Sequence, residues 1–205
     1  DGNSVRLVRR REDEPWDVAG QLTYRFREPQ YIDFEFRCTP HRAELFGERG
    51  YAIFFFANYM NDVLDPALHF RGIDRPGGEE RWIRADAPKG HRDWNRGGTY
   101  RHARAADLEY DADHTQPFYF GKAGRGMTLI LMFDRTWTER DEIRFSLFKF
   151  KLPQRPRPAW DFQYVVHKAE SGSEYGFRGR LVWKKFVDPD DCLREYEAWA
   201  ASLRQ

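Results

Sequence analysis

The chain has 205 residues, a formal net charge of +1 and a mean hydropathy of −0.84. This length suits one undivided domain over residues 1 to 205, and 34 basic against 33 acidic residues create no field that would gather nucleic acid or an anionic membrane. The longest apolar runs, residues 52 to 57 and 127 to 133, are far shorter than the roughly 20 residues that span a bilayer. We therefore predict neither a nucleic-acid partner nor a membrane partner.

Strand patterns dominate the chain up to about residue 186. Residues 21 to 28 alternate apolar and polar side chains, and a short turn joins them to residues 31 to 38 as a predicted hairpin. Further strands are predicted at residues 51 to 58, 67 to 72, 81 to 85, 117 to 122, 127 to 134, 142 to 152, 159 to 168 and 175 to 186. The apolar parity changes at Leu147, which predicts a bulge or bend at that point.

The C-terminal residues 189 to 204 predict one amphipathic helix. Asp188 suits the N-cap and Pro189 the first helical position. Apolar residues then recur at helical spacing, with Trp199 at their edge; they are Leu193, Tyr196, Ala200 and Leu203. This helix is expected to pack on the outside of a sheet.

Many strands, one terminal helix and no alternation of strands with helices predict an all-β fold. We expect a two-sheet antiparallel β-sandwich of jelly-roll type, with a closed barrel as the alternative. The alternation predicts an inter-sheet core made of Ile32, Phe34, Phe36, Phe54, Phe56, Leu129, Leu131, Phe145 and Leu147.

The two cysteines, Cys38 and Cys192, leave two alternatives open: one long-range disulfide or two buried free thiols. The first ten residues contain no apolar signal segment. The compartment stays open: secreted or periplasmic if a signal peptide was removed, cytoplasmic otherwise.

Residues 86 to 116 show little periodicity and contain Trp94, Tyr100 and Tyr110, so we interpret them as an ordered, lid-like segment. The histidines at 91, 102 and 114 have no recognised metal-ligand spacing. Hard oxygen donors suggest a structural calcium ion as an alternative to plain turns, at Asp93, Asn95, Asp111 and Asp113. No other metal and no cofactor is predicted.

Residues 31 to 38 raise the main functional question. They place Tyr31, Asp33, Glu35 and Arg37 on the face opposite the predicted core, with the Cα atoms of the two carboxylates about 7 Å apart. The carboxylates suit the acid and base of a glycosidase. Alternatively, they form cross-strand ion pairs with Arg25, Arg27 or Arg37.

The run YIDFEF, residues 31 to 36, resembles the catalytic strand of concanavalin A-like laminarinases and endoglucanases, whose pattern is Glu-x-Asp-x-Glu. The resemblance implies a sandwich, with Asp33 as the central Asp and Glu35 as the general acid/base. Tyr31 stands where the nucleophilic Glu belongs, which argues against retaining hydrolysis by that mechanism. About thirty residues around it also look like the concanavalin-like domain of 3-keto-glycoside hydrolases.

Other polar strand faces are expected to join this one in a cleft. His69 and Arg71 share a face of one strand, and Asp161, Gln163 and His167 share a face of another. His69 or Tyr31 as base, with Arg71 on a uronate carboxylate, would supply a polysaccharide lyase. The predicted catalytic residues are Tyr31, Asp33, Glu35, His69 and Arg71, and the predicted substrate-binding residues are Arg25, Trp94, Tyr100, His102, Asp161 and Gln163.

Three hypotheses follow from this pattern. The first is a carbohydrate-active enzyme, a glycoside hydrolase or polysaccharide lyase, that acts on a glycan bound across a concave, aromatic-lined sheet. The second is a lectin-like module that binds a glycan without cleaving it. The third is a structural or interaction domain. A carbohydrate is thus the predicted ligand, and the oligomeric state is left open.

Overall fold

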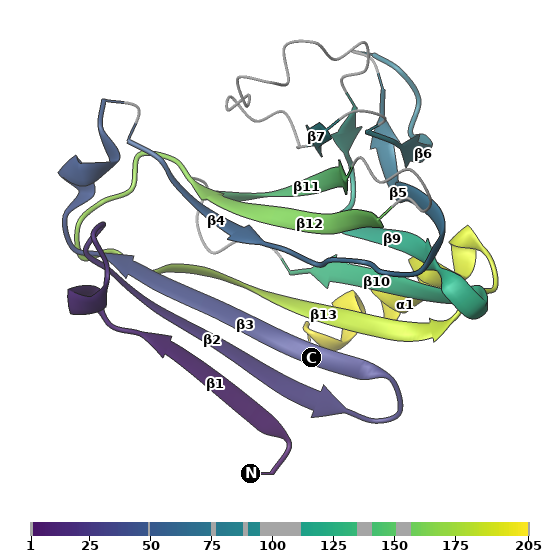
Figure 1. Cartoon of the computed structure of the whole chain (residues 1–205), viewed down its shortest axis with the longest axis horizontal. Coiled ribbons are helices and arrows are strands. Elements are labelled where there is room, and N and C mark those ends of the chain that lie inside the picture. The colour runs from purple at the N-terminus through teal and green to yellow at the C-terminus, as the bar shows by residue number, and fades with distance from the viewer. Residues whose placement is uncertain are drawn as a thin grey trace.

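The computed structural model describes residues 2–48, 50–74, 77–87, 90–94, 112–134, 141–150 and 157–204, with backbone only for Gly90, His91 and Trp94. These ranges form two antiparallel sheets stacked on each other (Figure 1). The arrangement confirms the predicted β-sandwich and rules out the closed barrel, while the jelly-roll connectivity stays a prediction.

The larger sheet has nine described strands in the order β1-β2-β3-β13-β10-β9-β5-β6, with β8 paired to β5. The strands are β1 (Ser4–Arg9), β2 (Val18–Arg27), β3 (Tyr31–Pro40), β5 (Val63–Ile73), β6 (Arg81–Ala85), β8 (Asp113–His114), β9 (Phe118–Ala123), β10 (Met127–Phe133) and β13 (Tyr175–Lys185). Single turns of 3₁₀-helix occur at Arg11–Asp13, Ala43–Phe46 and Gly124–Gly126.

The smaller sheet has four described strands in the order β4-β12-β11-β7. They are β4 (Ala52–Phe56), β7 (Gly90–Trp94), β11 (Asp141–Phe150) and β12 (Arg157–Val166). Two of these strands, β11 and β12, pair without interruption from Asp141 opposite Val166 to Phe150 opposite Arg157, so the bulge predicted near Leu147 is wrong. A register shift occurs instead between β5 and β9.

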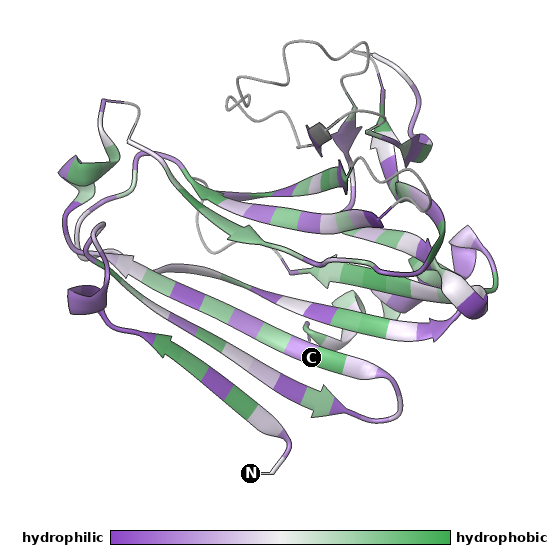
Figure 2. Cartoon of the chain, viewed as in Figure 1, coloured by the Kyte–Doolittle hydropathy of each residue, from purple (hydrophilic) through white to green (hydrophobic). Residues whose placement is uncertain are grey.

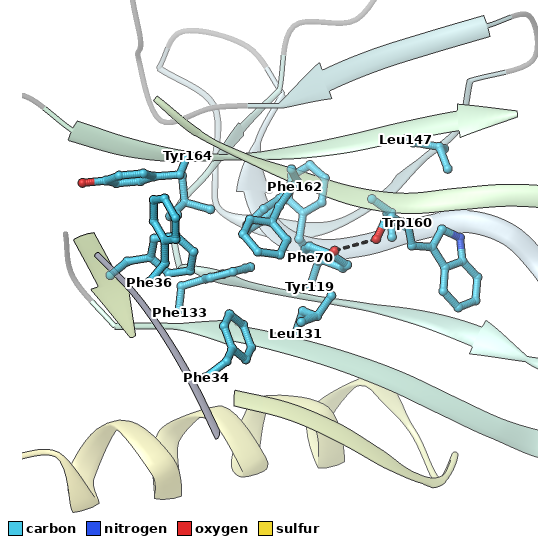
Figure 3. Close-up of a cluster of buried hydrophobic side chains, with 14 of the residues drawn as sticks. Phe34, Phe36, Phe70, Tyr119, Leu131, Phe133, Leu147, Trp160, Phe162 and Tyr164 are labelled. Carbon is cyan, nitrogen blue, oxygen red and sulfur yellow. Dashed lines mark hydrogen bonds between the residues drawn. The ribbon is translucent and has the colours of Figure 1, made fainter. Parts of the chain in front are cut away.

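The inter-sheet core follows from the alternation along the strands, which Figure 2 shows on β3 and β12. Aromatic rings from both sheets meet there (Figure 3), and the Phe133 and Phe162 ring centroids are 4.6 Å apart. Trp160 lies over Gly121, where an added Cβ would come within 2.5 Å of the indole. Six of the nine predicted core residues are buried, Phe54 and Phe56 are partly buried against them, and Ile32 is partly exposed.

The outer face of the larger sheet carries the helix α1 (Pro189–Ser202). The Asp188 carboxylate caps it by accepting from the backbone N–H of Asp191 at 2.6 Å. Leu193, Tyr196 and Leu203 contact the sheet as predicted, but Cys192 and Trp199 are the most buried helix residues. The docking stripe is therefore Cys192, Tyr196, Trp199 and Leu203, at spacings of four, three and four residues.

Both cysteines are free thiols buried on opposite faces of the larger sheet. Cys38 lies in the inter-sheet core and Cys192 lies on the face of α1 that packs against the sheet, so the two are not joined in a disulfide. Burial raises the pKa of Cys192 to about 12. No helix in the described ranges is long and apolar enough to cross a membrane.

Candidate functional site

The two carboxylates of residues 31 to 38 lie on the outer face of the larger sheet, where arginines bind them. The Asp33 carboxylate accepts from Arg180 Nε at 2.6 Å and Nη2 at 3.1 Å, and from Arg27 Nε at 3.3 Å. The Glu35 carboxylate accepts from Arg37 Nε at 2.5 Å, and this bond raises the pKa of Arg37. The geometry is thus the cross-strand ion pairing that was the alternative to a cleft.

Tyr31 is part of the contact between this face and α1. Its hydroxyl donates to Glu195 Oε2 at 3.2 Å. The Arg180 guanidinium lies 4.9 Å from the Tyr31 ring centroid and 6.0 Å from the Trp199 ring centroid. These contacts indicate that Tyr31 helps to hold the helix on the sheet.

His69 lies on the same face but at the other flank of α1. Strands β3 and β5 are separated by β13, β10 and β9, a span of roughly 19 Å. His69 stacks on Phe120 at 4.9 Å, and its Nε2 is 3.2 Å from Asp65 Oδ2. Burial lowers the pKa of His69, and the Asp65 carboxylate opposes this shift.

Arg71, beside His69, is also engaged in local contacts. Its Nη2 donates to Glu80 Oε2 at 3.0 Å, and its guanidinium lies 5.6 Å from the Trp82 ring centroid. The prediction of one cleft shared by Asp33, Glu35, His69 and Arg71 is therefore wrong, because α1 packs between the two pairs. Arg25, 4.0 Å from Glu35, stays with the first pair.

Only part of the predicted lid, residues 86 to 116, lies in the described ranges. Its ends form β7 and β8, while Tyr100, His102, Asn95 and Asp111 lie outside the described ranges. His114 is buried, with Nε2 3.0 Å from the Ile143 carbonyl oxygen and its ring stacked on Phe145. The described residues contain no cluster of three or more potential metal ligands. The strand of Trp94 belongs to the smaller sheet, which separates it from Asp33 and Glu35.

A different set of polar side chains meets on the outer face of the smaller sheet, where β4, β12, β11 and β7 lie side by side (Figure 1). Asp161 pairs in register with Ser146, and Ser146 pairs with Asp93. These three residues, here called the polar row, cross β12, β11 and β7 and point away from the sandwich core. The predicted residues Asp161 and Gln163 thus share one face with Asp93, whereas Trp94 pairs in register with Phe145, whose side chain faces the core.

Hydrogen bonds hold the polar row in place. The Asp161 carboxylate accepts from the Asn58 backbone N–H at 2.7 Å. Gln163 Nε2 donates to Asp93 Oδ1 at 3.0 Å, so a side chain of β12 meets one of β7 across β11. Asp161, Ser146 and Gln163 are at most 4% exposed although they lie on an outer face.

An ion-pair group adjoins the polar row. The guanidinium of Arg144, 1% exposed, donates from Nε to Glu142 Oε1 at 2.6 Å. His167 Nε2 is 3.2 Å from the same oxygen. Glu142 thus accepts from the Arg144 guanidinium and lies against the His167 ring, next to the polar row.

Sequence reasoning did not single out Arg144, Ser146 or Glu142, and it weighed Asp93 only as a calcium ligand. A signal was present in residues 142 to 148, where Glu142, Arg144 and Ser146 alternate with large apolar residues. The face they form became evident only with the pairing of β11 to β12 and β7.

No protein-family model matches this chain, and no curated protein is similar to it in sequence. The candidate site is therefore assigned from the geometry of this chain alone.

Proposed function

We propose that this chain is a glycoside hydrolase whose site is the outer face of the smaller sheet. The observation that carries the proposal is the polar row, in which Asp161 and Asp93 stand on one face of one sheet with Ser146 between them. Two carboxyl groups that flank a glycosidic bond are the chemical requirement for most glycoside hydrolysis: one protonates the leaving oxygen while the other activates water or attacks the sugar.

The spacing favours inversion over retention. The Cα atoms of Asp161 and Asp93 are two strand spacings apart, roughly 10 Å. Gln163 of β12 donates to the Asp93 carboxylate at 3.0 Å, and we expect the two carboxyl groups to lie closer together than the Cα atoms. Inverting enzymes hold their carboxyl groups about 6.5 to 9.5 Å apart to admit a water, whereas retaining enzymes need about 5 Å. We expect the first product to have inverted anomeric configuration.

Charge on the same face favours a hydrolase over a lyase. A lyase must neutralise the carboxylate of a uronate while a base removes the neighbouring proton. The Arg144 guanidinium, next to the polar row, is bonded to Glu142, and the His167 ring contacts the same carboxylate. His69, Arg71 and Tyr31, the lyase candidates from sequence, are engaged on the other sheet.

A polysaccharide screen tests this proposal. Wild-type protein and Asp161→Asn would be incubated with neutral and uronate-containing polysaccharides, and both new reducing ends and the ultraviolet absorbance of unsaturated uronates would be measured. Hydrolysis predicts new reducing ends without that absorbance, and a loss of a hundredfold or more in Asp161→Asn.

Two outcomes would overturn the proposal. Unsaturated products would indicate a lyase. Glycan binding by calorimetry, without cleavage of any bound polymer, would indicate the lectin-like alternative. Asp161→Asn retains an oxygen that can accept from Asn58, and its thermal unfolding serves as the control for the fold.

A further inference from the structure

Next to the polar row, the outer face of the smaller sheet carries a group of aromatic side chains. Tyr59 bridges to Ala159 beside β12, and its ring centroid lies 5.8 Å from that of Phe150 on β11. The Phe148 and Phe150 centroids are 4.8 Å apart. We name Tyr59, Phe148 and Phe150 the aromatic platform.

Two of the three platform rings are open to solvent, unlike the core rings, while Phe148 is half-buried. Tyr59 is 64% exposed and Phe150 is 40% exposed. Large rings left in water forgo the free energy of burial, and an apolar patch beside buried polar groups is the usual composition of a ligand site.

The platform and the polar row are in register. Ala159 precedes Asp161 by two residues on β12, and Phe148 follows Ser146 by two residues on β11. Two residues along a strand span roughly 7 Å, so the platform begins within one to two sugar units of the polar row. Ala159, between Tyr59 and Phe148 in its row, contributes only a small side chain to this face.

We propose that the aromatic platform binds the sugar unit next to the scissile bond, and that the substrate is a neutral glycan of pyranose units with apolar ring faces. The inference rests on the proposed function, because the polar row supplies the cleavage. A pyranose with equatorial hydroxyls presents C–H groups on its faces, and these stack on aromatic rings through hydrophobic contact and dispersion.

Charge supports a neutral substrate. The unit next to the scissile bond lies beside Asp161 and Asp93, and a uronate there would place a third carboxylate near two others. The Arg144 guanidinium, which is bonded to Glu142, already has an anionic partner. The site chemistry therefore disfavours anionic sugars at this position.

Kinetics of platform variants test the inference. On a neutral oligosaccharide that the wild-type protein cleaves, Tyr59→Ala and Phe150→Ala should each raise KM tenfold or more and leave kcat within about twofold, because stacking holds the substrate without touching the reacting atoms. Tyr59→Phe, which keeps the ring, should retain the wild-type KM. Phe26→Ala is the matched control, since Phe26 is 54% exposed but lies on the larger sheet.

The outcomes separate this inference from the proposed function. If the wild-type protein cleaves no glycan, the proposed function fails. If the wild-type protein is active and Asp161→Asn is not, an unchanged KM in Tyr59→Ala and Phe150→Ala overturns the platform alone. A kcat/KM higher on a uronate-containing polymer than on its neutral counterpart would overturn the assigned substrate class.

Discussion

The two outer faces of the sandwich differ in how exposed their charged side chains are. On the larger sheet, Asp33 and Glu35 form ion pairs with arginines that are at least partly exposed, and α1 packs beside them. On the smaller sheet, Asp161 and Arg144 are about 1% exposed. Both faces arise from the same apolar-polar alternation, so the alternation alone does not distinguish a solvated face from a site.

The energetic difference explains why the second face is the better functional candidate. An exposed ion pair contributes about 0 to 1 kcal/mol, so it is easily formed and easily replaced. A buried charge costs several kcal/mol unless partners satisfy it, and an apolar residue of similar size is often more stabilising. A buried polar row that an apolar row could replace therefore calls for a function.

The largest expected effect is on turnover. Asp161→Asn and Asp93→Asn should each lower kcat by a hundredfold or more on a cleaved glycan, because each removes a proton-transferring group. Glu35→Gln, a matched carboxylate-to-amide change on the other face, should leave kcat within about twofold. A comparable loss in Glu35→Gln, with the fold intact, would reverse the roles of the two faces.

The next largest effect is on the free energy of unfolding, and it comes from a change in the helix that packs on the larger sheet. Trp199 is 4% exposed on the face of α1 that packs against the sheet, so Trp199→Ala should lower the free energy of unfolding by about 3 to 5 kcal/mol. Denaturant unfolding measures this, with the exposed Glu197→Ala as control. Activity below the unfolding transition should be unchanged, and a kcat loss without a stability loss would contradict a structural role for this face.

A smaller, pH-dependent effect is expected from His69. Its pKa is lowered by burial, so the unfolded chain binds the proton more readily than the folded chain does. The contribution of His69 to stability is therefore complete above the ordinary pKa of about 6.5 and is lost as the pH falls toward the lower folded pKa. His69→Gln should flatten the fall in unfolding free energy between about pH 7 and pH 5. An identical pH dependence of the unfolding free energy in the wild-type protein and in His69→Gln would contradict this expectation.

The smallest effect is expected from a change at Asp33, which the sequence suggested as a catalytic residue. Asp33→Asn removes the charge that pairs with Arg180 and Arg27, and we expect a loss of at most about 1 kcal/mol in unfolding free energy. Chemical denaturation at low and high salt measures the change, which should shrink at high salt. A loss of several kcal/mol would show that this face is not an ordinary solvated one.

Much of the fold could be predicted because periodicity reports which side of a strand is buried. Phe34 and Phe36 alternate with charged residues, and Asp188 with Pro189 marked the start of the helix. Strand β1 was missed because Val5 and Leu7 stand among arginines in a strand whose residues are all exposed. The helix stripe was shifted because Cys192 carries little weight in a hydrophobic pattern, although it is fully buried.

The candidate site was harder to predict because it depends on pairing between distant strands. Asp161 and Gln163 were placed correctly on one face, but their partners Ser146 and Asp93 come from β11 and β7. The position of α1 between Asp33 and His69 likewise depends on the strand order β3-β13-β10-β9-β5. Periodicity within one strand carries no information on either arrangement.

The most direct test of the central claim is a crystal structure of Asp161→Asn soaked with an oligosaccharide that the wild-type protein cleaves. We expect sugar density over Tyr59 and Phe150, with a glycosidic oxygen between residue 161 and Asp93. Density over Asp33 and Glu35, or beside His69, with an empty outer face on the smaller sheet, would contradict the account.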